Sequence, residues 1–112
     1  MPIQHWSDQI WVVQLLDEPA LSEDLTSLRM QAESASDYPD AVIDLSGVTV
    51  MTSSHLSQLL RLRKAAIDHD AHLRLTAVPD SVWVVFLTTG LDKMFEFAPD
   101  VPTALAGLQL NQ

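Results

Sequence analysis

The stretch AVIDLSGVTVMTSSHLSQLL, residues 41–60, contains a transition from strand to helix. Its first five residues form a short apolar run with one aspartate, which is typical of a buried central strand. Ser46-Gly47 predicts a turn out of that strand. Further along, leucines recur at helical spacing, so we expect a helix over residues 53–68. A buried strand followed by a helix is the repeating unit of α/β sheets.

The same alternation of strand and helix extends in both directions from this stretch. β-branched and aromatic runs predict strands, and apolar residues three or four positions apart predict helices. Gly90 is expected to end the third helix. This order predicts an α/β sandwich with an N-terminal hairpin. The expected strands cover residues 3–6, 9–16, 41–45, 48–50, 72–77 and 95–98, and the expected helices cover residues 21–32, 53–68, 80–89 and 100–108, with Ser22, Asp80 and Asp100 as caps.

Length and composition limit the class of protein. The 112 residues fit one domain, expected over residues 1–112, and 47% hydrophobic residues argue against disorder. The chain has no cysteine, which excludes disulfides and thiolate metal sites. A net charge of −9 makes nucleic acid a poor partner. No signal peptide is evident, and the apolar run over residues 82–87 is too short to cross a bilayer. We therefore expect a cytoplasmic protein without direct membrane insertion.

A set of short motifs carries a family resemblance. In chain order they are Asp44-Leu45, Ser53-Ser54, Leu56, Thr88–Asp92, Phe95 and Ala104-Leu105. Their order and spacing over residues 10–108 resemble the STAS domain of anti-sigma factor antagonists. In that family, an Asp-Leu strand end is followed by Asp-Ser-Ser-Gly-Leu at the start of a helix. Thr52 stands in place of the family aspartate here, and His55 in place of the glycine.

The resemblance implies an α/β fold of the STAS type, in which a mixed β-sheet with an N-terminal hairpin and parallel strands is flanked by about four helices. It also implies a regulatory module with no enzymatic activity. Its implied partner is an anti-sigma factor of the serine kinase fold, and its implied phosphorylation site is Ser53, with Thr52 and Ser54 as alternatives. Phosphate on Ser53 would break the complex. The alternative is a constitutive STAS subunit of a larger complex, such as a phospholipid-transporting ABC system or a stress-sensing scaffold. In that case residues 52–55 are a contact surface and not a switch.

The residues at this helix start have a physical interpretation of their own. Either Ser53 or Ser54 can act as N-cap, and the unpaired amides and positive dipole end can also receive a phosphate. Two added negative charges would leave the fold intact and oppose a buried contact with a partner. His55 is expected on the exposed first turn. We therefore treat Thr52, Ser53, Ser54 and His55 as candidate partner-binding residues.

The third expected helix is apolar on all sides. Its inward face is predicted to contain Val82, Val85, Phe86 and Thr89, while Trp83, Val84 and Leu87 gather on the opposite side. A helix of this kind is either fully buried or covered by a partner. We expect a partner or a second copy of the chain to contact Trp83, Val84 and Leu87. The alternative is that WVVFL forms a strand.

Two further features bear on whether the chain has an anion site or a metal site. Arg63 falls within the apolar face of the helix over residues 53–68, where its stem can lie on apolar surface; an anion or a partner is the alternative contact. Residues 68–72 (DHDAH) have the composition of a metal site, but a helix end followed by a strand start would turn their side chains apart. The sequence contains no glycine-rich phosphate loop and no nucleophile–base signature. We therefore expect no metal, no cofactor and no catalytic residues.

Overall fold

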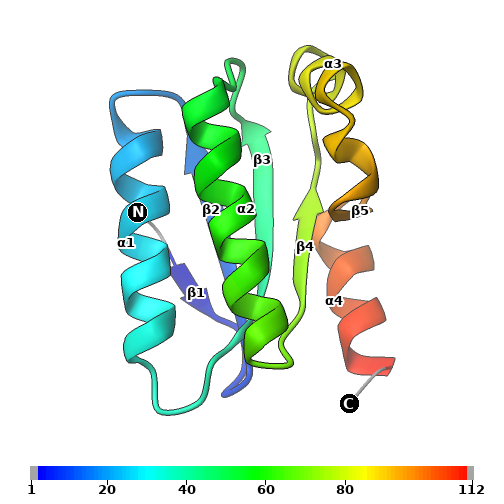
Figure 1. Ribbon diagram of the computed structural model, residues 1–112. Coiled ribbons are helices and arrows are strands. Elements are labelled where there is room, and N and C mark those ends of the chain that lie inside the picture. The colour runs from blue at the N-terminus through cyan, green and yellow to red at the C-terminus, as the bar shows by residue number, and fades with distance from the viewer. Residues whose placement is uncertain (1–2, 111–112) are drawn as a thin grey trace.

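The computed structural model describes residues 3–110. No helix among these residues is long and apolar enough to cross a membrane. Within residues 3–110, five of the six predicted strands and all four predicted helices are present, which confirms the α/β class (Figure 1). The elements are β1 (Ile3–His5), β2 (Ile10–Leu16), α1 (Ala20–Ser34), β3 (Asp40–Gly47), α2 (Ser53–Asp68), β4 (Leu73–Thr76), α3 (Asp80–Thr89), the 3₁₀ turn η1 (Leu91–Lys93), β5 (Glu96–Ala98) and α4 (Val101–Leu110).

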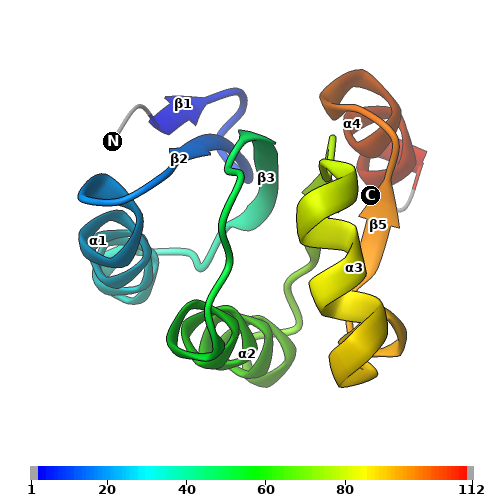
Figure 2. The same cartoon turned by 90° about the horizontal axis from the view of Figure 1, so that it is seen from above.

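The five strands form one mixed sheet in the order β1-β2-β3-β4-β5. The first two strands form the predicted antiparallel hairpin, and the other neighbours are parallel. Each crossover therefore moves in the same direction across the sheet. Because such crossovers are almost always right-handed, their helices are expected on one face. Figure 2 shows α1, α2 and α3 on that face and α4 on the other.

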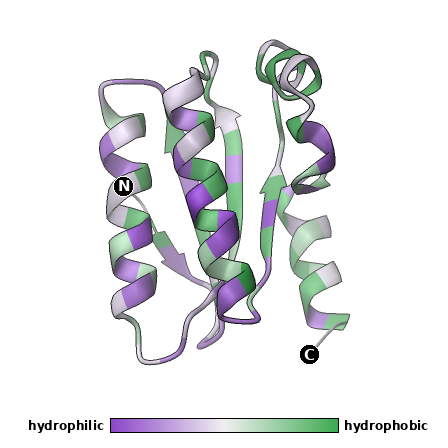
Figure 3. Ribbon diagram, in the orientation of Figure 1, coloured by the Kyte–Doolittle hydropathy of each residue, from purple (hydrophilic) through white to green (hydrophobic). Residues whose placement is uncertain are grey.

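A hydrophobic cluster lies on each face of the sheet. Val13, Ile43 and Leu75 lie in register on adjacent strands and face the large core beneath α1, α2 and α3. On the other face, Val42 packs with Leu108 of α4 in a smaller cluster. The central strand β3 is thus buried on both sides, as its apolar sequence predicts. In Figure 3, hydrophobic colour runs over much of α3 and α4, whereas α1 and α2 alternate between polar and apolar residues.

Several predicted element ends need correction. β3 continues through Gly47, which pairs with Leu16 of β2, so Ser46-Gly47 is not a turn; residues 48–50 form no strand. Ser22 does not cap α1: the helix begins at Ala20, and the backbone N–H of Ser22 donates to Glu18 Oε1 at 2.9 Å.

The predicted cap of α3 is wrong and that of α4 is confirmed. Asp80 lies inside α3, whose N-cap is Pro79, because the Pro79 carbonyl accepts the first amides of the helix. At α4, Asp100 Oδ1 accepts from the backbone N–H of Thr103 at 2.8 Å. This contact is the side-chain cap that the sequence predicts.

Gly90 ends α3 in the left-handed region, with φ of 75°. A Cβ at this position would meet no atom within 4 Å, so Gly90→Ala would introduce backbone strain without a clash. We expect the substitution to lower the free energy of unfolding by about 1 kcal/mol. Gly107→Ala is the matched control, because Gly107 lies within α4 in equally open space. There alanine should raise stability by about 1 kcal/mol. Urea denaturation measures both values, and two changes of the same sign would contradict the assignment.

Candidate functional site

The start of α2 is closed by a reciprocal cap between Thr52 and His55. Thr52 is the N-cap residue: its hydroxyl accepts from the backbone N–H of His55 at 3.4 Å. In return, Nδ1 of the His55 ring accepts from the backbone N–H of Thr52 at 3.0 Å. The helix begins at Ser53 as predicted, but the prediction of Ser53 or Ser54 as N-cap is wrong. The extended backbone of Thr52 places its hydroxyl over the first turn, so the two serines already belong to the helix.

His55 is buried, with 3% of its surface exposed, and not on an exposed turn as the sequence analysis expects. Folding back onto the cap brings its ring between α2 and the β2–α1 loop, where Nε2 lies 2.7 Å from Glu18 Oε1. The hydroxyl of Ser22 donates to the same oxygen. Hydrogen bonds from the side chains of Ser22 and His55 hold the pKa of Glu18 below its usual value. The spacing of Thr52 and His55, three positions apart as in a capping box, is the sequence signal that could have indicated the cap, but it does not indicate the contact with Glu18.

A second carboxylate fixes the loop that leads into α2. Asp17 accepts from the backbone N–H of Thr49 at 2.8 Å, from the Thr49 hydroxyl at 2.6 Å and from the backbone N–H of Val50 at 3.2 Å. The side-chain and backbone hydrogen bonds from Thr49, followed by the bond from Val50, lower the pKa of Asp17. Asp17 and Glu18 thus anchor both sides of the α2 start to the β2–α1 loop. Sequence reasoning identified neither residue.

Ser53 and Ser54 project from this anchored start into solvent. Both residues are exposed, and within the described part of the chain neither side chain forms a hydrogen bond. The first amides of α2 lie at the positive end of the helix dipole. A serine hydroxyl at this position is open to a modifying enzyme, and an attached phosphate would be favoured by the dipole.

The outer face of α3 is apolar and adjoins this end of the molecule. Val84 and Leu87 are 57% and 50% exposed. The hydroxyl of Ser81 donates to the Thr49 carbonyl at 3.2 Å, which places the first turn of α3 beside the loop that carries Val50, itself 62% exposed. Figure 1 shows α3 and this loop at the same end of the sheet. The first turn of α3 therefore adjoins the loop that leads into α2, and the apolar α3 face, defined here as Val84 and Leu87, lies further along the same helix.

The other side chains of α3 are partly as predicted. Val82 and Phe86 are buried, whereas Thr89, expected inward, is exposed. Trp83, expected on the outer face, is half-buried because its ring packs edge-on against Phe97 at a centroid distance of 5.0 Å. Trp83 therefore borders the apolar α3 face and also contributes to packing.

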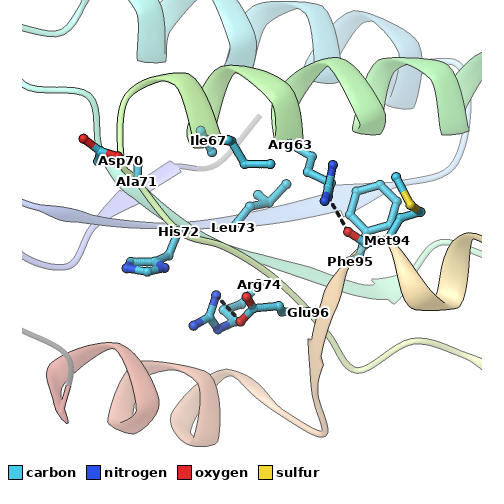
Figure 4. Close-up of a pocket in the computed structure, with 11 residues that line it drawn as sticks. Arg63, Ile67, Asp70, Ala71, His72, Leu73, Arg74, Met94, Phe95 and Glu96 are labelled. Atoms are coloured by element: carbon cyan, nitrogen blue, oxygen red, sulfur yellow. Dashed lines mark hydrogen bonds and ion pairs between the residues drawn. The ribbon is translucent and has the colours of Figure 1, made fainter.

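A hollow of about 360 Å³ lies between α2 and the β4–β5 edge (Figure 4). Nε of Arg63 donates to the Met94 carbonyl there, and Arg74 pairs with Glu96 at 2.6 Å. The head group of Arg63 thus reaches a backbone carbonyl beyond its own helix.

The DHDAH segment spreads its side chains in different directions. Asp68 pairs with Lys64 at 2.8 Å, and the His69 ring stacks on Tyr38 at 4.3 Å. The described residues contain no group of three or more His, Asp or Glu side chains that could hold a metal ion. This geometry offers no metal centre at the position where the composition resembles one.

The amino-acid sequence shows to which family the chain belongs. Residues 16–104 match the family model of the STAS domain. The chain belongs to the STAS domain family. STAS domains are regulatory and binding modules, and the α2 start described above lies within the matched region. Among curated proteins, no sequence matches the chain.

Solved structures with the same fold include several STAS proteins. A proposed anti-sigma factor antagonist from Thermotoga maritima superposes with a TM-score of 0.83 at 15% identity, covering 96% of this chain and 93% of that one. A variant of RsbS from Moorella thermoacetica gives a TM-score of 0.79 at 20% identity over all of both chains. A structure from the stressosome, a signal integration and transduction hub, gives 0.75 at 22% identity, with 96% of each chain covered. At these identities, the likeness establishes the STAS fold.

Proposed function

We propose that this STAS protein is a cytoplasmic anti-sigma factor antagonist in bacteria, which binds an anti-sigma factor of the serine kinase fold and is switched by phosphorylation of Ser53. The observation that carries the proposal is the exposed Ser53 side chain, free of hydrogen bonds within the described residues, at the start of α2. The likeness to an anti-sigma factor antagonist supports the class of partner.

The geometry favours Ser53 over its neighbours as the phosphoacceptor. The Thr52 hydroxyl is used in the cap, and a phosphate there would displace the contact with the backbone N–H of His55. Ser54 is also exposed, but Ser53 is the first residue of α2 and lies nearest to the positive end of the dipole. Phosphate at Ser53 can therefore be added without loss of the cap.

The proposed partner surface consists of the exposed part of the α2 start and the apolar α3 face. Thr52, Ser53 and Ser54 would contact the partner directly, whereas buried His55 would act by holding Thr52 in place. The apolar α3 face would supply hydrophobic contact area, with Trp83 at its border. A phosphate brings nearly two negative charges into this contact, where they must be desolvated or paired. The same face, with Trp83, is also our candidate for self-association.

A second function is supported by two observations. A structure from the stressosome has the same fold over 96% of this chain, and Thr52 replaces the aspartate of the family motif. A constitutive subunit of a larger assembly would use the same surface without phosphorylation. The two functions differ in whether a charge at Ser53 changes binding.

Ser53→Asp is expected to weaken binding to a purified kinase-fold anti-sigma factor from the same genome by at least tenfold, or about 1.4 kcal/mol. Its melting temperature should stay close to that of the wild type, because a helix start accepts negative charge. Ser53→Ala should retain binding and resist modification by the kinase and ATP. Calorimetric titration and mass spectrometry provide the measurements.

Ser57→Asp is the matched control, because Ser57 is exposed one turn further along the same helix. It should bind like the wild type. Thr52→Ala and Ser54→Ala locate the phosphoacceptor if Ser53 is not the modified residue. If the kinase leaves the wild type unmodified and Ser53→Asp binds normally, the constitutive subunit takes the place of the switch.

A further inference from the structure

The His55 ring is held by hydrogen bonds on both of its nitrogens. A backbone N–H can only donate, so Nδ1, 3.0 Å from the backbone nitrogen of Thr52, carries a lone pair. The ring hydrogen therefore lies on Nε2 and is donated to Glu18 Oε1 at 2.7 Å. This assignment describes a neutral imidazole that acts as acceptor on one side and donor on the other.

A second proton on this ring cannot be added without a change of hydrogen bonds. It would occupy Nδ1 and face the N–H of Thr52, so that two donors oppose each other. The Thr52 hydroxyl oxygen, 3.2 Å from Nδ1, is the acceptor within reach. Protonation would therefore exchange the bond from the Thr52 amide for a bond to the Thr52 hydroxyl. One half of the reciprocal cap would be lost.

The carboxylates nearest to the ring lie on the β2–α1 loop. Glu18 faces Nε2 from the β2–α1 loop, and Asp17 lies on the same loop and interacts electrostatically with His55. From α1, the side chain that takes part is that of Ser22, which is uncharged and donates its hydroxyl hydrogen to Glu18. Among the described residues, neither carboxylate forms an ion pair with a lysine or an arginine.

We propose that His55 is a proton-sensing residue that sets the hydrogen bonding at the start of α2. In the neutral state the ring closes the cap, and in the protonated state it releases the Thr52 amide and strengthens its contact with Glu18. Histidine is the side chain whose charge ordinarily changes between pH 5 and 8. The exposed Thr52–Ser54 segment would therefore be presented differently in mildly acidic and neutral conditions, independently of any phosphorylation.

Two-dimensional NMR of the wild-type protein between pH 5 and 8 tests this inference. The ring resonances of His55 and the amide resonance of Thr52 should change together, with one shared midpoint. Glu18→Gln keeps a hydrogen-bond acceptor but removes the charge, so it should move that midpoint to lower pH. The backbone amides of α4, on the other face of the sheet, should not follow this titration.

His55→Gln is the decisive variant. A glutamine three residues after the N-cap can accept from the Thr52 amide, so the cap should persist and α2 should remain folded. The change at the Thr52 amide between pH 5 and 8 should then be lost. A His55 ring that stays neutral down to pH 5 overturns the inference. So does a Thr52 amide that is unchanged while the ring titrates, or a pH response that survives in His55→Gln.

Discussion

Phe86→Ala is expected to lower the free energy of unfolding by about 3–5 kcal/mol. The Phe86 side chain is fully buried on the inner face of α3 and packs edge-on against Phe95 and Phe97, at centroid distances of 5.8 and 5.3 Å. Truncation removes these aromatic contacts and leaves a cavity that the surrounding residues fill only in part. Because small domains are stable by about 5–15 kcal/mol, much of the total would be lost. Urea denaturation followed by fluorescence measures the change.

Val84→Ala is the control on the same helix. Val84 is 57% exposed, so its truncation should change stability by about 0.5 kcal/mol or less. If the apolar α3 face binds a partner or a second copy, this variant should weaken association while the fold persists. Equal losses of stability for Phe86→Ala and Val84→Ala would show that the whole of α3 is interior.

Leu59→Ala is expected to cost about 2–5 kcal/mol. Leu59 is fully buried in the centre of α2, where the helix covers the sheet beside α1. Ile67→Ala is the matched substitution near the end of the same helix, where the side chain is 54% exposed. It should cost about 0.5 kcal/mol or less. Calorimetric unfolding of both variants decides the comparison, and a larger cost at Ile67 would contradict the placement of α2.

The sequence predicts α2 well because its periodicity is long and regular. The expected range of residues 53–68 is the observed one, and three of the leucines that recur at helical spacing, Leu56, Leu59 and Leu62, are buried. Ile67 continues this spacing near the end of the helix, but it is 54% exposed and borders the hollow near the β4–β5 edge. Periodicity identifies the face of a helix, but it does not reveal where the neighbouring sheet ends.

The candidate site at the start of α2 was predicted only in part. The position of Ser53 and Ser54 at a helix start follows from local sequence, and the structure keeps both exposed. The contacts that fix this start join residues far apart in the chain: His55 to Glu18, and Thr49 to Asp17. No local pattern encodes such pairs. The burial of His55 could therefore not be derived before the loops were placed in space.

The order of the strands across the sheet bears on how the chain reaches its native state. Among the described strands, each one pairs with the next strand in the chain, so each pairing closes only one hairpin or one crossover. The entropy lost on closing a loop grows with its length, and local topologies fold faster than those with distant pairings. Strand addition can therefore proceed from β1 towards β5 as the polypeptide emerges during synthesis. The nascent sheet would always offer its growing edge to the next segment made.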